Sequence, residues 1–95
     1  GMRIKLTANY FVEQSTNAPH LWDLYRKRTA KETGKQYETA EAYGLDLKQV
    51  AGKVPYFEIL SKEGEVATFE EFVKEFESKQ KEIISEFIKQ VKESK

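Results

Sequence analysis

The first group of residues with chemical potential is basic: five cations lie within ten positions, in a segment that also contains aromatic rings. Such side chains bind phosphates by displacing counterions, and exposed rings stack on bases. A charged strand–loop–strand tip is also typical of a solvated hairpin whose edge opposes aggregation. The net charge of zero favours this second interpretation, because nucleic-acid-binding domains usually carry a clear basic excess. The candidate nucleic-acid contact comprises Arg26, Lys27, Arg28, Lys31 and Lys35, with Trp22, Tyr25 and Tyr37 nearby.

Candidate catalytic groups are few. His20 is the single histidine; it follows a proline, with Asp23 in reach, and a general base needs a positioned partner. The chain has no cysteine, which excludes disulfides, thiolate metal sites and thiol nucleophiles. Carboxylates recur at helical salt-bridge spacing, and isolated glycines form no phosphate loop. We therefore expect no enzyme activity, no catalytic residue, no metal site and no cofactor.

Length and composition predict one small folded domain over residues 1–95. The chain is 39% hydrophobic and 34% charged. The hydrophobic fraction suits a modest core and exceeds that of a disordered chain. Residues 1–62 carry ten basic and seven acidic side chains, whereas residues 63–95 carry six and nine. No apolar run is long enough to span a bilayer, and no signal-peptide pattern is present. We expect a cytoplasmic protein that has no membrane partner.

Residues 1–44 have the period-two pattern of β-strands. Ile4 and Leu6 alternate with Arg3 and Lys5, and the pattern resumes at residues 10–12 beyond a bulge or turn. Turn formers at residues 15–19 precede a second strand over residues 20–28. Gly34 supplies the positive φ of a hairpin, and residues 36–44 form a third strand. The pattern predicts an α+β fold that begins with a three-stranded antiparallel meander.

The hydrophobic period changes to that of helices after Gly44. The spacing of apolar residues over residues 45–62 predicts a helical segment. We expect a break near Pro55, because proline lacks the N–H that a continuing helix needs. A strand over residues 55–62 is the alternative, since short apolar runs do not separate the two states. The period of apolar residues over residues 68–93 predicts a long amphipathic helix, with Thr68 and Glu71 in capping-box register at its N-terminus.

The length of this C-terminal helix suggests a docking surface. At about 35–40 Å it exceeds the roughly 26 Å diameter of a domain of this size. An apolar stripe that extends beyond its own sheet needs a cover, which a second copy in a homodimer or another protein could provide. The alternative is that the stripe simply closes the core of its own chain. The predicted self-association residues are Phe76, Ile83, Ile84, Phe87, Ile88 and Val91.

Three short motifs are distinctive, and their positions are Ile4, Leu6, Asn9 and Tyr10, then Gly34, Lys35 and Tyr37, and then Tyr43 and Gly44. They resemble motifs of a group of small uncharacterised proteins of Gram-positive phages and prophages. The resemblance spans most of the chain, although the stretch around Gly52 and Pro55 departs from it. It implies a cytoplasmic accessory protein of an infected or lysogenic bacterium that acts by binding a host or phage protein, or nucleic acid. The group has no established activity, so it assigns no functional residue.

Overall fold

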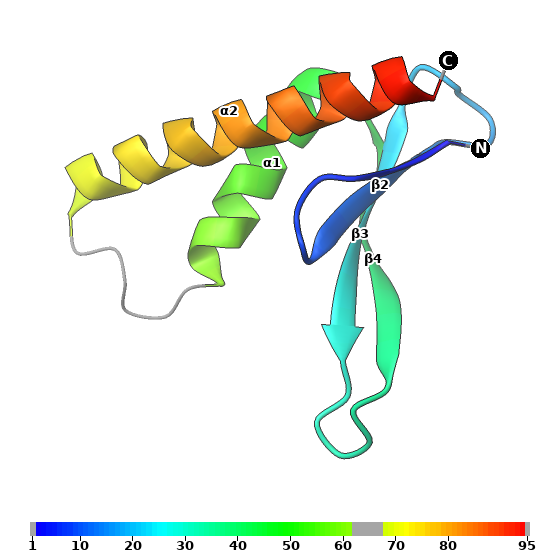
Figure 1. Ribbon diagram of the computed structural model, residues 1–95, viewed down its shortest axis with the longest axis horizontal. Coiled ribbons are helices and arrows are strands. Elements are labelled where there is room, and N and C mark those ends of the chain that lie inside the picture. Colours follow the sequence, from blue (N-terminus) through cyan, green and yellow to red (C-terminus); the bar gives the residue numbers. More distant parts are fainter. Residues whose placement is uncertain (1, 62–67, 95) are drawn as a thin grey trace. The chain divides into compact units, whose positions relative to one another are not determined.

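The computed structural model of the chain describes residues 2–61 and 68–94, which form four strands and two helices (Figure 1). The elements follow the order β1 (Arg3–Lys5), β2 (Tyr10–Gln14), β3 (Trp22–Thr29), β4 (Gln36–Leu45), α1 (Leu47–Leu60) and α2 (Phe69–Glu93). The predicted α+β class is confirmed. Internal contacts divide the chain into two compact units, a sheet unit of residues 1–47 and a helical unit of residues 48–95. The expectation of one domain stays a prediction.

The sheet has four antiparallel strands in the order β1-β2-β3-β4, so the expected three-stranded meander was wrong by one strand. What looked like one interrupted strand is a hairpin, because the chain reverses between β1 and β2. The Thr7 hydroxyl accepts hydrogen bonds from the backbone N–H groups of Asn9 and Tyr10, at 3.3 and 3.1 Å. Leu6 N–H also donates to the carbonyl of Tyr10 at 3.0 Å. These bonds satisfy the backbone of the reversal without glycine or proline.

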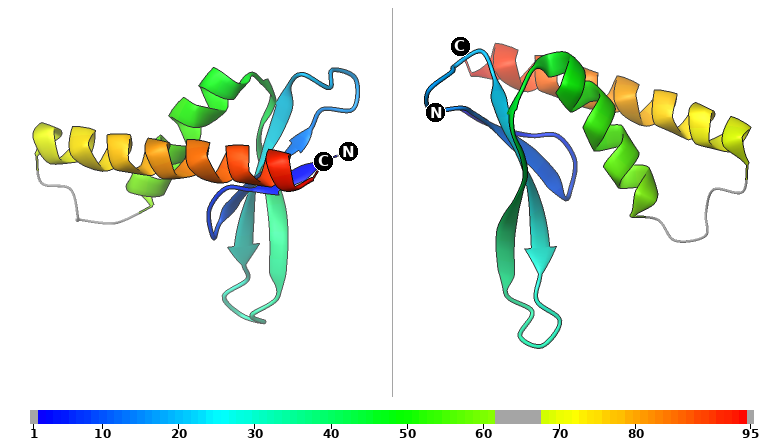
Figure 2. Two further views of the ribbon diagram at one scale, coloured as in Figure 1. Left: turned by 45° about the horizontal axis from the view of Figure 1, so that its top comes forward. Right: turned by 180° about the vertical axis from the view of Figure 1, so that it is seen from behind.

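The β3–β4 hairpin extends beyond the pairing of β2 with β3, which ends at Arg26 (Figures 1 and 2). Gly34 has the predicted positive φ, +72°, at the hairpin tip. Near the other end of β4 the pairing shifts register twice, and there Gly44 has a φ of +67°. Its N–H donates to the Asp23 carboxylate at 3.0 Å, and the Ser15 hydroxyl donates to the same oxygen at 2.6 Å. Asp23 therefore holds the irregular end of β4 against the start of β3.

Strand β2 is buried on both faces, because Tyr10, Phe11 and Val12 are all buried. On one face, Val12 lies between Ile4 of β1 and Leu24 of β3 in the pairing register. On the other face, the Phe11 ring stacks on the Tyr25 ring at 5.2 Å. The sequence pattern predicted the alternation, but side-chain stacking supplies the cover of the second face.

Helix α1 continues without a break past Pro55, which lies in its interior. For the residues up to Leu60, the predicted break and the alternative strand were therefore both wrong. Proline cannot donate to the carbonyl oxygen four residues earlier, which belongs to Ala51. The Gln80 side-chain amide of α2 donates to that oxygen instead, at 2.9 Å. The Ala51 carbonyl is therefore hydrogen-bonded by a side chain of another helix, although Pro55 has no N–H to donate. Residue 62, the last of the predicted segment, lies outside the described residues.

Helix α2 runs unbroken for 25 residues, and its bounds agree with the predicted 68–93 within one residue. Thr68 is its N-cap, and the Thr68 hydroxyl accepts a hydrogen bond from Glu71 N–H at 3.1 Å. Glu70 and Glu71 in the first turn and Lys92 in the last turn complement the helix dipole. The Thr68 half of the predicted capping box and the amphipathic character are confirmed.

Candidate functional site

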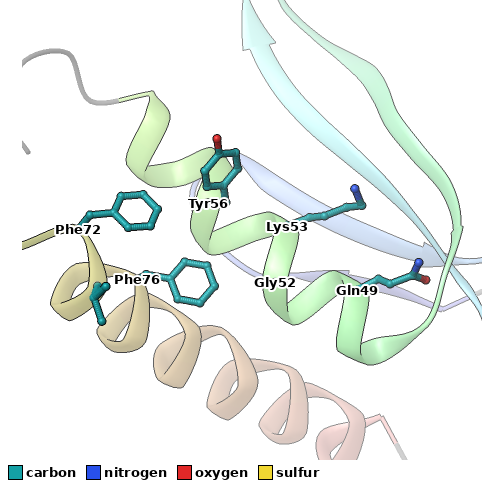
Figure 3. Close-up of a pocket in the computed structure, with 7 residues that line it drawn as sticks. Gln49, Gly52, Lys53, Tyr56, Phe72 and Phe76 are labelled. Carbon is teal, nitrogen blue, oxygen red and sulfur yellow. The ribbon is translucent and has the colours of Figure 1, made fainter. Parts of the chain in front are cut away.

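An open groove of about 540 Å³ lies between the two helices of the helical unit (Figure 3). The helices diverge from the Ala51–Gln80 hydrogen bond toward the end of α1 and the start of α2 (Figures 1 and 2). This divergence leaves side chains of both helices without full cover. The groove is lined by Gln49, Gly52, Lys53 and Tyr56 of α1 and by Phe72, Val73 and Phe76 of α2.

Aromatic rings form the walls of the groove. Phe72 and Phe76 are one helical turn apart on α2, with ring centroids 6.1 Å apart, and both point toward α1 (Figure 3). Tyr56 lies across from them and meets the Phe72 ring edge-on at 6.0 Å. The polar ends of Lys53 and Gln49 point away from the rings (Figure 3). Such a groove suits an apolar side chain or an amphipathic helix of a protein partner.

Gly52 keeps part of this groove open. A Cβ at this position would have no neighbouring atom within 4 Å, so the space beside the α1 backbone is empty. Glycine in a helix interior costs up to about 1 kcal/mol relative to alanine. Its presence therefore removes a side chain from the groove at the expense of local helix stability.

The residues predicted for self-association fall into three classes of exposure. Ile83 is buried, with 2% of its surface exposed, so it is a core residue within the described structure. Ile84 and Ile88 lie one turn apart and are 43% and 48% exposed. Phe87 and Val91 are half-buried. Phe76 lines the groove, so the exposed apolar edge and the groove belong to the same helix.

The structure does not bring the five predicted nucleic-acid-binding residues onto one face. Strand alternation puts Arg26 and Arg28 on one face of β3 and Lys27 on the other. Arg28 is hydrogen-bonded to the Thr39 hydroxyl at 3.0 Å and lies 3.5 Å from the Glu41 carboxylate. The guanidinium of Arg26 lies over the Tyr10 ring, at 5.7 Å from its centroid. Lys31 and Lys35 are exposed at the hairpin tip. Nucleic-acid binding by this hairpin stays a prediction.

A network of charged and aromatic groups covers the face of the sheet that carries Lys27. Arg3 of β1 donates to Glu13 at 2.9 Å and, through two nitrogens, to Glu38 of β4 at 3.0 and 3.1 Å. Hydrogen bonds to Glu38 raise the pKa of Arg3 above its ordinary value. Its guanidinium carbon lies 4.0 Å over the centre of the Phe11 ring. Burial raises the pKa of Tyr25 above its ordinary value, and the nearby Asp23 charge raises it further.

His20 is exposed in the turn that precedes β3. Asp23, the predicted nearby carboxylate, accepts hydrogen bonds from Ser15 and Gly44. Across residues 2–61 and 68–94, no cluster of His, Asp and Glu side chains is arranged to hold a metal ion. In the same residues, neither helix combines the length and apolar character needed to cross a membrane.

Comparison of the chain with protein-family models, with curated proteins and with solved structures gave no match. The functional proposal therefore depends on the geometry of the described residues.

Sequence reasoning found the apolar residues of α2 but missed the groove and the hydrogen bond that sets its position. Two signals were present: a proline inside one apolar segment, and Gln80 inside the apolar stripe of another. A polar residue within an apolar stripe indicates a buried acceptor, but the sequence does not identify which carbonyl it meets.

Proposed function

We propose that this protein is a non-catalytic binding protein that acts through protein–protein interaction, with a second copy of its own chain as partner. The observation that carries this proposal is the exposed apolar surface of α2, where Ile84 and Ile88 are about half exposed on the helix that also forms the groove. Apolar side chains that protrude on a helix and an apolar groove on the same helix are self-complementary in a two-fold symmetric pair. Each copy would place its isoleucines against the groove of the other.

The charge of α2 supports an antiparallel pair. Residues 69–78 contain four glutamates and one lysine, whereas residues 79–93 contain four lysines and three glutamates. In an antiparallel pair the acidic half of each helix lies beside the more basic half of the other, whereas a parallel pair would place like charges together. The same distribution also favours the helix itself through its dipole.

The helical period limits which apolar residues of α2 can meet in an antiparallel pair. Phe76 and Ile84 lie about 80° apart around the helix, so both can border one contact in which Ile84 lies beside Phe76 of the second copy. Two-fold symmetry repeats this contact.

Sedimentation equilibrium at tens of micromolar tests the proposal, and a dimer is expected. Ile84→Glu places a charge in the apolar contact and should give a monomer of unchanged helix content by circular dichroism. Ser85→Glu is the matched control, because it adds the same charge at the next, exposed position of α2. A wild-type chain that stays monomeric, or a dimer that survives Ile84→Glu, overturns the proposal.

The proposed setting follows from the resemblance to phage and prophage proteins. We propose a cytoplasmic accessory role in an infected or lysogenic bacterium, in which the dimer also binds a host or phage protein. Co-purification from infected cells, compared between the wild-type chain and the Ile84→Glu variant, tests whether the dimer is the binding form.

A further inference from the structure

A second hollow, of about 200 Å³, lies in the sheet unit at the corner where β1 turns into β2. Its lining includes three cationic side chains, Arg3, Lys5 and Lys27, together with the turn of residues 7–9, and contains no carboxylate. Concave sites that are lined by one sign of charge concentrate ions of the opposite sign. The hollow therefore favours an anion.

Pairing in the sheet brings the two lysines to the same face. Lys5 of β1 pairs with Phe11 of β2, and Phe11 pairs with Tyr25 of β3. Lys27 lies two residues beyond Tyr25, so its side chain shares the face of Lys5. The backbone N–H of Lys27 donates to the carbonyl of Asn9 at 2.7 Å, which fixes β3 beside the turn. Glu38 of β4 lies opposite Lys27 in the pairing register, and its carboxylate accepts two hydrogen bonds from Arg3. Among the described residues, the Lys27 ammonium forms no ion pair.

Arg3 contributes a fixed plane to this hollow. Its charge is offset by Glu13 and Glu38, but the three hydrogen bonds to these carboxylates hold the guanidinium in one orientation. One face of the guanidinium lies on the Phe11 ring, while 48% of the Arg3 side-chain surface stays exposed. Guanidinium planes stack on nucleobases as aromatic rings do. The hollow thus combines two cationic groups with a preoriented stacking surface.

We propose that this hollow binds a nucleoside phosphate, with the phosphate at Lys5 and Lys27 and the base on the exposed face of Arg3. The site differs from the basic hairpin tip, because it uses Lys27 with residues of β1 and excludes Lys31 and Lys35. It lies in the sheet unit, whereas α2 belongs to the helical unit. A free nucleotide and a single-stranded nucleic acid present the same chemistry to it.

Titration of the full-length, ¹⁵N-labelled chain tests the proposal, with adenosine monophosphate in one arm and an oligothymidylate of about ten nucleotides in the other. At low salt, the amide signals of residues 7–11 and 27 should shift. An effect of both ligands indicates a nucleotide site, and an effect of the oligonucleotide alone indicates a single-strand site. Two phosphate contacts predict a slope of about −1.4 for the logarithm of oligonucleotide affinity against that of salt concentration.

Lys27→Gln should weaken binding of either ligand severalfold and bring the oligonucleotide salt slope to about −0.7, since one phosphate contact is lost. Lys31→Gln, at the exposed tip of the same hairpin, is the matched control and should leave the affinity and slope unchanged. No shift with either ligand at low salt overturns the proposal. Shifts confined to residues 31–35, or equal effects of the two substitutions, also overturn it, because they would place the contact at the hairpin tip.

Discussion

The contact between Gln80 and the Ala51 carbonyl makes a quantitative prediction about helix α1. Gln80→Met keeps the length and helix propensity of the side chain but removes its donor. The Ala51 oxygen then has neither a backbone N–H, because residue 55 is proline, nor the side-chain donor at 2.9 Å. An unpaired carbonyl costs about 1–3 kcal/mol when buried, and this one is half-buried. We expect the free energy of unfolding to fall by about 1 kcal/mol.

The physical reason predicts that this loss depends on Pro55. In a Pro55→Ala background, residue 55 has an N–H that can donate to Ala51, so Gln80→Met should cost little. The double-mutant cycle should therefore show a coupling of about 1 kcal/mol between Pro55 and Gln80. Urea unfolding followed by circular dichroism measures it, since 1 kcal/mol corresponds to a midpoint shift of roughly 0.5 M.

The matched control is Gln90→Met, the same chemical change on the same helix. The Gln90 amide donates to the Glu86 carboxylate at 2.9 Å, with no involvement of Pro55. This substitution should cost the same in both backgrounds. An equal cost of Gln80→Met with and without Pro55 would refute the reasoning, because it would show that Gln80 does not replace the missing donor.

Two further predictions concern backbone conformation and pH. Gly44→Ala should lower the free energy of unfolding by about 1–2 kcal/mol, because the backbone φ at this position is +67°. The new Cβ would add no steric clash, since its nearest neighbour, a side-chain carbon of Leu21, lies at a van der Waals distance of 3.9 Å. Gly52→Ala should raise the free energy of unfolding by up to about 1 kcal/mol in the same urea unfolding assay. A change of the same sign at both glycines would contradict the argument. Stability should also fall as the pH rises above 10, because the unfolded chain then ionises Tyr25 while its raised pKa keeps it neutral in the folded state. Tyr25→Phe should remove part of that fall in chemical unfolding measured between pH 9 and 11, and an unchanged profile would assign it to other groups.

Local patterns were sufficient for much of the fold. Strand alternation, the positive φ at Gly34, and the cap and apolar period of α2 all depend on neighbours within a few residues, and the structure confirms each of them. The prediction failed where a distant partner or a short turn decided the outcome. The β1–β2 reversal uses a threonine side chain rather than glycine or proline, so its sequence resembles a bulge.

The candidate sites depend on tertiary structure to a larger extent. The sequence by itself determined that five basic residues lie close together along the chain and that α2 carries an apolar stripe. Strand alternation then separated Lys27 from Arg26 and Arg28, and sheet pairing placed Lys27 on the same face as Lys5, in the lining of one hollow. Likewise, Pro55 indicated a broken helix until Gln80 supplied the donor that proline lacks. Local conformation follows from sequence because it is set by adjacent groups, whereas a hydrogen bond or a cavity needs atoms that only the folded chain brings together.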